Sequence, residues 1–205
     1  VREESSVNQY RFVMPGASLN KNEWEKSLEI MINKSRHEDY LVISGSLPPN
    51  VPIDFYNQLI VQLKDNHVKI VVDTSGEPLK KLRRAGVYML KPNMHELEEL
   101  TGRQLTTEED QEKAAQELVD DGTCEILILS LGAAGIFILT SKTKERLRSP
   151  TVKVISRIGA GDSTVAGMMV GLMRKMSLRE SAMLAVAAGA AAVMTPGTEL
   201  CRKED

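Results

Sequence analysis

The stretch I-L-I-L-S-L-G-A-A-G, residues 126–135, gives the clearest indication of the fold. Its first six residues form an almost unbroken apolar run, which is typical of a β-strand covered by other elements on both faces. Residues 41–44, 70–73 and 87–90 are further short apolar runs, and each ends in a loop rich in glycine, proline or polar residues. The sequence therefore predicts a series of buried strands.

Segments with helical periodicity lie between these strands. They span residues 21–35, 55–63, 77–84, 94–100, 108–121, 163–175 and 178–194. Thr107-x-x-Asp110 and Ser177-x-x-Glu180 are capping-box patterns that mark two helix starts. Residues 10–14, 135–140 and 144–154 are predicted as strands, the last two as an antiparallel pair. The alternation predicts an α/β fold in which helices cover both faces of a mostly parallel sheet, in one domain over residues 1–205.

Composition limits the classes of function. The 205 residues carry a net charge of -2, so we expect neither nucleic acid nor an acidic membrane as partner. The longest apolar run, residues 183–194, is too short to cross a bilayer. Cys124 and Cys201 are far apart and the histidines are scattered, which argues against a disulfide scaffold or a zinc site and favours a reducing, cytoplasmic location. The chain opens without an initiator methionine and reads like a fragment.

The stretch R-I-G-A-G-D-S, residues 157–163, carries the first chemical motif. Gly159, Ala160 and Gly161 stand near the start of a predicted helix, where free backbone N–H groups and the helix dipole attract an anion. Neither a Walker loop nor a dinucleotide-binding glycine pattern is present. Asp162 would repel a phosphate, but it suits a base that deprotonates a hydroxyl attacking phosphorus. The alternative is a helix start that Asp162 caps.

Three further features fit a phosphotransferase. Asn93 and Glu96 stand one helical turn apart with hard oxygen ligands suited to Mg²⁺ through its waters, the alternative being a solvated helix start. The turn at residues 130–135 could lie against a nucleotide, or could be a simple hairpin turn. The small-residue helix at 185–192 could approach an adenine ring, or could be a tightly packed core helix.

The order of these blocks is more specific than any one of them. V-I-S-G-S-L-P-P, V-V-D-T-S-G-E, L-K-P-N-x-x-E-L, L-S-L-G-A-x-G and G-A-G-D-S together resemble the ribokinase-like carbohydrate kinases of the PfkB type. The resemblance runs from about Tyr10 to Cys201 and implies the ribokinase-like α/β/α sandwich. It also implies that ATP and Mg²⁺ take part, and that the N-terminal third, with most of a dimerising lid, is missing from this chain.

The resemblance assigns roles residue by residue. It implies catalysis by Asp162 as base, with an anion hole made by Gly159, Ala160 and Gly161. It implies nucleotide contacts from Lys91, Asn93, Ser130, Gly132, Gly135, Val186 and Ala190. It implies Mg²⁺ at Asn93 and Glu96, and sugar contacts from Ser46 and Asp162. It implies a monovalent cation such as K⁺ at Ser156, Ile158, Ala192, Thr195 and Gly197.

Within the family, the sequence resembles the branch that phosphorylates sugar phosphates. The opening Y-R-F-V-M-P-G and the closing P-G-T-E-L-C look most like the minor type of 6-phosphofructokinase, which converts fructose 6-phosphate to fructose 1,6-bisphosphate. Fructose-1-phosphate and tagatose-6-phosphate kinases remain alternatives, as does a nucleotide-binding module without catalysis. A homodimer is expected for the full-length protein. Arg157 departs from the family, which usually has threonine there; it could reach a phosphate or point to solvent.

Overall fold

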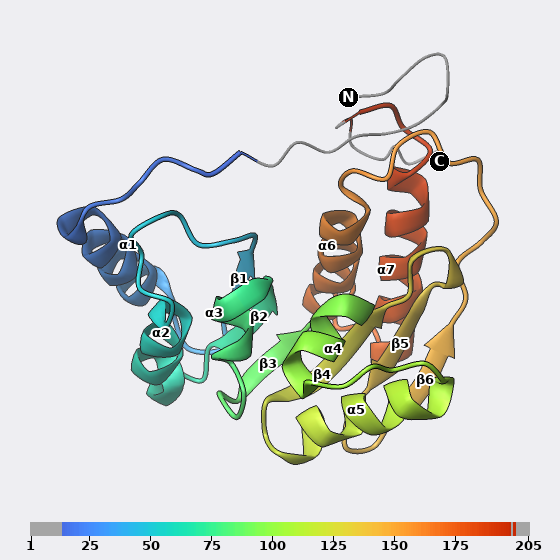
Figure 1. The fold of residues 1–205 in the computed structure, drawn as a ribbon, viewed down its shortest axis with the longest axis horizontal. Helices are drawn as coiled ribbons and strands as arrows, with labels where there is room; N and C mark the ends of the chain where they lie inside the picture. Colours follow the sequence, from blue (N-terminus) through green and yellow to red (C-terminus); the bar gives the residue numbers. More distant parts are fainter. Residues whose placement is uncertain (1–13, 198, 200–205) are drawn as a thin grey trace.

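The computed structural model describes residues 14–197 and 199, and its six strands form one sheet in chain order (Figure 1). The strands are β1 (Tyr40–Ser44), β2 (Lys69–Asp73), β3 (Val87–Leu90), β4 (Cys124–Ser130), β5 (Ile136–Leu139) and β6 (Lys144–Leu147). The three pairs from β1 to β4 are parallel. The pair of β4 with β5 and the pair of β5 with β6 are antiparallel. The predicted, mostly parallel sheet is therefore confirmed.

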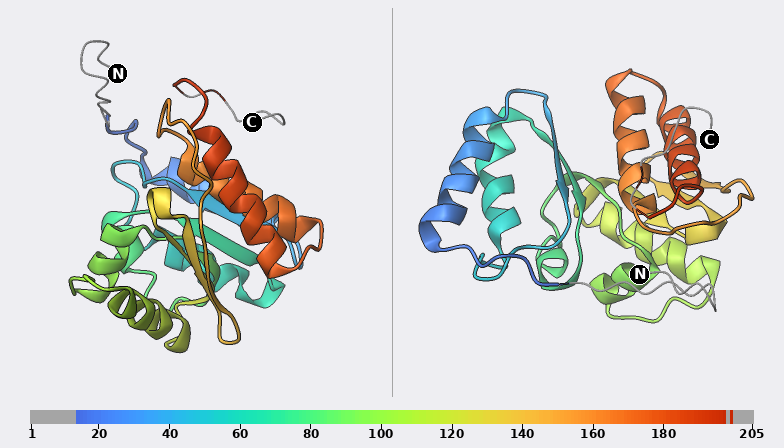
Figure 2. Two further views of the ribbon diagram at one scale, coloured as in Figure 1. Left: turned by 90° about the vertical axis from the view of Figure 1, so that its right-hand side faces the viewer. Right: turned by 90° about the horizontal axis from the view of Figure 1, so that it is seen from above.

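Seven α-helices within the described residues cover the two faces of this sheet. They are α1 (Lys21–Lys34), α2 (Phe55–Leu63), α3 (Gly76–Lys80), α4 (Met94–Thr101), α5 (Glu108–Asp120), α6 (Ala160–Met173) and α7 (Leu178–Ala192). Side chains of α1 to α5 pack in one hydrophobic core, and those of α6 and α7 pack in the other. Figure 2 shows the sheet between these two layers, which is the predicted three-layer arrangement.

The position of β4 in the sheet explains the apolar run at residues 126–129. Leu127 and Leu129 point into the core beneath α1 to α5, while Ile126 and Ile128 point into the core beneath α6 and α7. Because successive side chains of a strand point to opposite faces, both sets must be apolar when both faces are covered. The apolar run therefore reports the position of β4 between the layers.

Three predicted boundaries differ from the structure by three residues or more. The helix expected at 77–84 ends at Lys80, because the chain turns through a left-handed Arg84 (φ 60°) before β3. The strand expected at 144–154 ends at Leu147, because its partner β5 offers four residues to pair with. The helix expected from 163 begins at Ala160. Of the strand expected at 10–14, residues 10–13 lie outside the described residues and Met14 has no regular structure. Within the described residues, no helix is long and apolar enough to span a membrane.

Candidate active site

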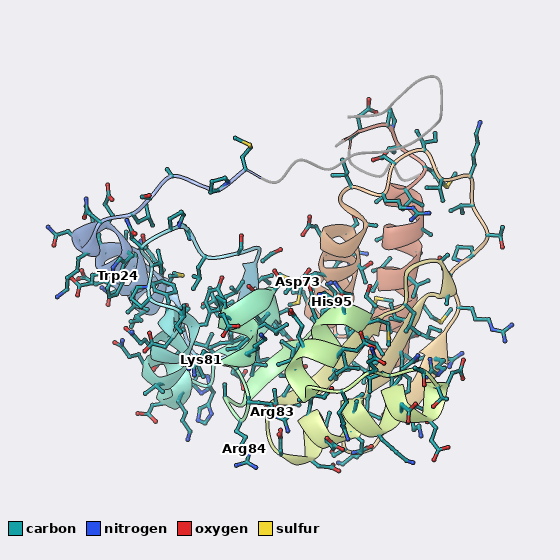
Figure 3. All side chains as sticks on the ribbon, in the orientation of Figure 1. Trp24, Asp73, Lys81, Arg83, Arg84 and His95 are labelled. Atoms are coloured by element: carbon teal, nitrogen blue, oxygen red, sulfur yellow. The ribbon has the colours of Figure 1, made fainter. Side chains whose placement is uncertain are left out.

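The carboxyl ends of the four parallel strands meet at one edge of the sheet. Ser44 ends β1, Asp73 ends β2, Lys91 follows β3 and Ser130 ends β4. In Figure 3, Asp73 marks this end of the sheet, with Arg83 and Arg84 at the opposite end. A cleft of about 1130 Å³ lies here, which is where open α/β sheets bind their ligands.

Many of the predicted site residues line this cleft. They are Ser46, Lys91, Asn93, Glu96, Ser130, Ser156, Ile158, Gly159, Gly161, Asp162 and Gly197. The other predicted residues lie outside its lining: Gly132, Gly135, Ala160, Val186, Ala190, Ala192 and Thr195. The cleft therefore brings together residues from the two halves of the chain.

Asp162 lies in the first turn of α6, beside the glycines. Gly159 precedes the helix in the left-handed region (φ 82°), and its carbonyl accepts a hydrogen bond from the N–H of Ser163. The Oγ of Ser44 donates a hydrogen bond of 3.1 Å to Oδ1 of Asp162 across a sequence separation of 118 residues. The carboxylate is exposed and held from the β1 side, so its second oxygen can accept a proton from a ligand.

An ion pair lies next to the glycines. Nζ of Lys91 is 3.1 Å from Oδ2 of Asp73, and the two side chains are 7% and 17% exposed. Burial raises the pKa of the Asp73 carboxyl; the ammonium of Lys91 opposes this rise, and the nearby Asp162 adds to it. A Cβ on Gly161 would lie 3.6 Å from this ammonium, so the glycine backbone runs directly beside the pair.

Asn93 and Glu96 form a reciprocal capping box at the start of α4. The N–H of Asn93 donates to Oε2 of Glu96 at 2.8 Å, and the N–H of Glu96 donates to Oδ1 of Asn93 at 2.9 Å. The helix-start alternative is therefore realised, although both residues also line the cleft. Burial raises the pKa of the Glu96 carboxyl. The described residues contain no cluster of three acidic, histidine or cysteine side chains that could hold a metal by itself.

The small residues of α7 serve the contact between α6 and α7. Val186 and Ala190 are buried, and a Cβ on Gly189 would lie 2.5 Å from Oγ1 of Thr164 in α6. The packing expected of a core helix is therefore present, and the nucleotide contacts of Val186 and Ala190 stay a prediction. Gly135 is likewise required locally: it has φ 99°, and a Cβ there would collide with the carbonyl oxygen of Leu147.

The residues predicted to hold a monovalent cation come from two segments that contact each other, one before α6 (Ser156 and Ile158) and one at the end of α7 (Ala192, Thr195 and Gly197). The Oγ of Ser156 donates to the carbonyl of Gly197 at 3.0 Å and accepts from the N–H of Ile158. The Oγ1 of Thr195 lies 2.9 Å from the carbonyl oxygens of Ala192 and Glu199. Ser156 and Thr195 are buried, so their hydroxyls fix a loop rich in carbonyl oxygens.

Comparison with known proteins identifies the family. Residues 3–205 match the description "pfkB family carbohydrate kinase". The chain belongs to this family. It is 40% identical over 205 residues to the ATP-dependent 6-phosphofructokinase isozyme 2 of Mycobacterium tuberculosis, and 41% identical over 206 residues to that of Escherichia coli. These alignments cover 100% of this chain but 60% and 66% of the relatives. The chain thus spans less than two thirds of the length of these curated relatives.

Solved structures of pfkB-family kinases show the same fold. Phosphofructokinase-2 from Escherichia coli, solved in complex with potassium, superimposes with a TM-score of 0.92 at 40% identity. That alignment covers 98% of this chain and 65% of the other. Ribokinase of Arabidopsis thaliana, 22% identical, has a TM-score of 0.69 over 90% of this chain and 56% of the other. The predicted ribokinase-like fold is confirmed.

Several residues that line the cleft were absent from the predicted set, among them three at the carboxyl ends of β1 and β2. Ser44, Asp73 and Thr74 line the cleft, and Thr74 is buried, with its hydroxyl donating to the carbonyl of Gly45 at 2.8 Å. Asp73 could have been predicted from the sequence, because it is the first polar residue after the apolar run of β2. The contact between Ser44 and Asp162 could not, since it depends on the tertiary fold.

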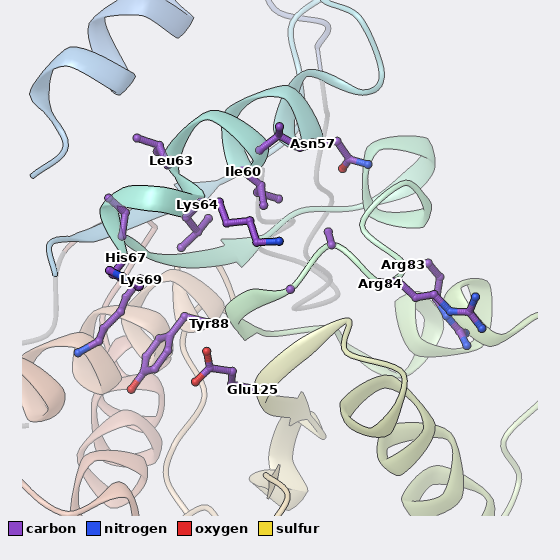
Figure 4. Close-up of a pocket in the computed structure, with 15 residues that line it drawn as sticks. Asn57, Ile60, Leu63, Lys64, His67, Lys69, Arg83, Arg84, Tyr88 and Glu125 are labelled. Atoms are coloured by element: carbon purple, nitrogen blue, oxygen red, sulfur yellow. The ribbon is translucent and has the colours of Figure 1, made fainter. Parts of the chain in front are cut away.

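A second hollow, of about 650 Å³, lies at the amino ends of β2, β3 and β4 (Figure 4). The cations that line it are Lys64, Lys69, Arg83 and Arg84. Arg83 already pairs with Asp121 at 2.7 Å, and the ammonium of Lys69 lies 5.2 Å and 5.7 Å from the ring centres of Tyr40 and Tyr88. None of the predicted site residues lines this second hollow. The cleft at the carboxyl edge of the sheet therefore remains the candidate site.

Proposed function

We propose that this chain supplies the nucleotide side and part of the sugar side of an ATP-dependent sugar-phosphate kinase. The observation that carries the proposal is the position of Asp162. Its carboxylate lies beside a glycine helix start, at the carboxyl edge of a parallel sheet, and Ser44 holds it at 3.1 Å. An anion site next to a base is what phosphoryl transfer to a hydroxyl needs.

The proposed reaction converts fructose 6-phosphate to fructose 1,6-bisphosphate. Asp162 takes the proton of the sugar's 1-hydroxyl while that oxygen forms a bond to the γ-phosphorus of ATP. The bond between this phosphorus and the β–γ bridging oxygen breaks, and ADP leaves with the bridging oxygen. The backbone N–H groups of Gly159, Ala160 and Gly161 stabilise the charge on the transferred group, the largest contribution expected of such a site.

The donor set at the cleft fits a magnesium ion that is bound partly through water. One oxygen of Glu96 is engaged in the capping box, and its second oxygen and the carboxylate of Asp73 are hard donors on the cleft lining. Asn93 and Glu96, with Asp73 close by, would hold the ion, which neutralises phosphate charge when bound. The oxygen-rich loop around Ser156 and Thr195 suits K⁺, and a relative's structure contains potassium.

The sugar phosphate is proposed from the relatives. Those named 6-phosphofructokinase are 40% and 41% identical, whereas the 1-phosphofructokinase of Bacillus subtilis is 31% identical over 186 residues, 90% of this chain and 61% of its own length. This ordering favours fructose 6-phosphate over fructose 1-phosphate, and tagatose 6-phosphate remains an alternative for the assay below. A homodimer is proposed for the full-length protein; a tetrameric form is known for phosphofructokinase-2 of Escherichia coli.

ADP release with each of the three sugar phosphates tests the proposal. We would assay this chain, a chain extended at its N-terminus, and the Asp162→Asn variant of each. Turnover should be fastest with fructose 6-phosphate, and Asp162→Asn should reduce kcat by about 10²–10⁴, the usual contribution of a positioned base. The exposed Asp65→Asn is the matched control and should leave kcat unchanged. ATP binding without turnover on any sugar would instead support a non-catalytic nucleotide-binding module.

A further inference from the structure

Two buried hydroxyl groups converge on one backbone carbonyl at the rim of the cleft. The Oγ1 of Thr74 donates to the carbonyl of Gly45 at 2.8 Å, and the hydroxyl of Tyr56 in α2 donates to the same oxygen at 3.4 Å. Thr74 and Tyr56 are 4% and 6% exposed, so both approach this carbonyl from the protein interior. Burial raises the pKa of the Tyr56 phenol, which therefore stays a protonated donor at neutral pH. The carbonyl of Gly45 is thus held inward by two donors.

The other backbone features of Gly45 also fix its conformation. Its N–H donates to the carbonyl of Asp73 at 2.9 Å, which continues the pairing of β1 with β2 by one residue. Its φ of 99° lies in a region that residues with a side chain rarely adopt. Both backbone polar groups of Gly45 therefore bond toward the end of β2, and Thr74, the residue after β2, makes the shorter bond to the carbonyl.

This arrangement sets the direction of the next N–H group, that of Ser46. The peptide bond between Gly45 and Ser46 is trans, so the C=O of Gly45 and the N–H of Ser46 point in opposite directions. Because the carbonyl points toward Thr74 in the interior, the N–H points away from it. Ser46 is exposed and lines the cleft, and among the described residues none accepts a hydrogen bond from this N–H. It is therefore an available donor at the cleft.

The N–H of Ser46 lies on the side of the cleft where the acceptor of the phosphoryl group has to bind. Ser44, two residues earlier, donates to Oδ1 of Asp162, the proposed base. A base must lie within hydrogen-bond reach of the hydroxyl that it deprotonates. The acceptor therefore occupies the end of β1, and the phosphate and hydroxyl oxygens of a sugar phosphate can each accept a hydrogen bond from a backbone N–H.

We infer that Thr74, assisted by Tyr56, positions the N–H of Ser46 to donate a hydrogen bond to an oxygen of the acceptor sugar phosphate. Thr74 acts through the Gly45 peptide, so it is a positioning residue. Without its hydroxyl, the carbonyl of Gly45 keeps only the longer bond from Tyr56, and the peptide spends less time in the orientation that binds the ligand. The inference rests on the proposed function, because it requires the cleft to bind a sugar phosphate.

Steady-state kinetics of Thr74→Val test the inference in the ADP-release assay, with this chain and with the chain extended at its N-terminus. The KM for fructose 6-phosphate should rise by about five- to tenfold, the effect of losing one neutral hydrogen bond. The KM for ATP and kcat should change by less than about twofold, since the lost contact serves sugar binding. Thr74→Ser keeps the hydroxyl and should restore the KM. Tyr56→Phe should raise it less than Thr74→Val, because its bond is longer.

Thr123→Val is the matched control. Thr123 is also buried, its hydroxyl donates to Oδ1 of Asp121 at 2.6 Å, and it precedes β4 at the opposite end of the sheet. Urea denaturation should show comparable losses of stability in Thr74→Val and Thr123→Val. The KM for fructose 6-phosphate should stay unchanged in Thr123→Val, which separates a positioning role from a general loosening of the fold.

Nuclear magnetic resonance of the isotope-labelled protein follows the Ser46 amide directly and does not require turnover. Fructose 6-phosphate should shift the Ser46 amide resonance in the parent and in Thr123→Val, and shift it less in Thr74→Val. A KM in Thr74→Val within twofold of the parent, an equal rise in Thr123→Val, or sugar-phosphate binding that leaves the Ser46 amide unshifted would overturn the inference while leaving the proposed function intact. A parent protein that neither binds nor phosphorylates any sugar phosphate would overturn both together.

Discussion

The ammonium of Lys91 and the carboxylate of Asp73 lie 3.1 Å apart at the carboxyl edge of the sheet, with Gly161 beside them. This ion pair joins the end of β2 to the residue after β3. Its two charges cancel, so the pair adds no net charge next to the proposed anion hole. Two charges of opposite sign, largely removed from water, depend on each other for their stability.

Replacing Lys91 by methionine should therefore destabilise the fold at neutral pH. The change leaves the Asp73 carboxylate buried near Asp162 without its cation, and we expect the free energy of unfolding to fall by about 2–4 kcal/mol. Urea denaturation at pH 8 measures this loss. Lys113→Met is the matched control, because it breaks an exposed pair with Glu109 and should cost less than about 0.5 kcal/mol.

The loss of stability in Lys91→Met should be smaller in acid. The pKa of Asp73 is raised in the folded protein, and loss of Lys91 should raise it further. A carboxyl whose folded pKa lies above its unfolded value contributes stability below the unfolded pKa and loses it as pH rises through the folded pKa. The deficit relative to the parent should therefore be smaller at pH 5 than at pH 8; equal deficits would contradict this assignment.

Ser44→Ala should slow turnover without weakening nucleotide binding. The substitution removes the hydrogen bond to Oδ1 of Asp162, so the base samples more orientations and fewer of them are productive. In the ADP-release assay we expect kcat to fall about tenfold, and the dissociation constant for ATP to stay within twofold. Ser44→Thr keeps a hydroxyl and should recover most of kcat. A change in ATP affinity alone would show that Ser44 acts elsewhere.

Alanine substitutions at Gly159 and Gly161, the two glycines of the proposed anion hole, should have different effects on stability. Gly159 has φ 82°, where an L-residue is disfavoured, so Gly159→Ala should cost about 1–2 kcal/mol of unfolding free energy. Gly161 lies within α6, and the nearest atom to an added Cβ would be 3.6 Å away. Gly161→Ala should be at least as stable as the parent, because alanine favours the helix. Chemical denaturation measures the free energy of unfolding of both variants. A Gly161→Ala variant less stable than Gly159→Ala would contradict these backbone conformations.

Gly167→Ala should disturb the contact between α6 and α7. An added Cβ would lie 2.8 Å from the carbonyl oxygen of Leu184 and 2.9 Å from Cα of Ala185, and these backbone atoms can yield only if the helices separate. We expect a loss of about 1–3 kcal/mol, as for other overpacked cores. Gly16→Ala, with no neighbour within 4 Å of the added Cβ, is the control and should change stability by less than about 0.5 kcal/mol. Thermal unfolding followed by circular dichroism compares the two.

The sequence predicted the layers and strands well because a strand buried on both faces needs apolar residues in succession, as at residues 126–129 of β4. Local chemistry also fixed helix starts, and the boxes at Thr107 and Ser177 are both present. The boundaries that were wrong depend on how the chain enters or pairs with neighbouring elements, which the residue pattern does not show. The strand after Lys144 ends where β5 stops offering hydrogen bonds, which its own residues do not reveal.

The site was harder to predict where one residue type serves two purposes. Asn93 and Glu96 cap a helix with the same oxygens that could hold a metal, so the pattern N-x-x-E cannot separate the roles. Small residues in α7 suit both a close helix contact and a flat ligand, and the structure places Gly189 against Thr164 of α6. Ser44 was missed because its partner Asp162 is 118 positions away.

The strand order has a consequence for how the chain matures during synthesis. Each strand pairs with the one made just before it, from β1 to β6, so pairing can follow the emerging chain with short loops to close. The hydrogen bond from Ser44 to Asp162 can form only after α6 has been synthesised and has left the ribosome. Nascent chains that end before α6 would lack both the proposed catalytic pair and the helices that cover the apolar face at Val71, Ile126 and Ile128, so we expect a truncated product to be inert and prone to aggregate.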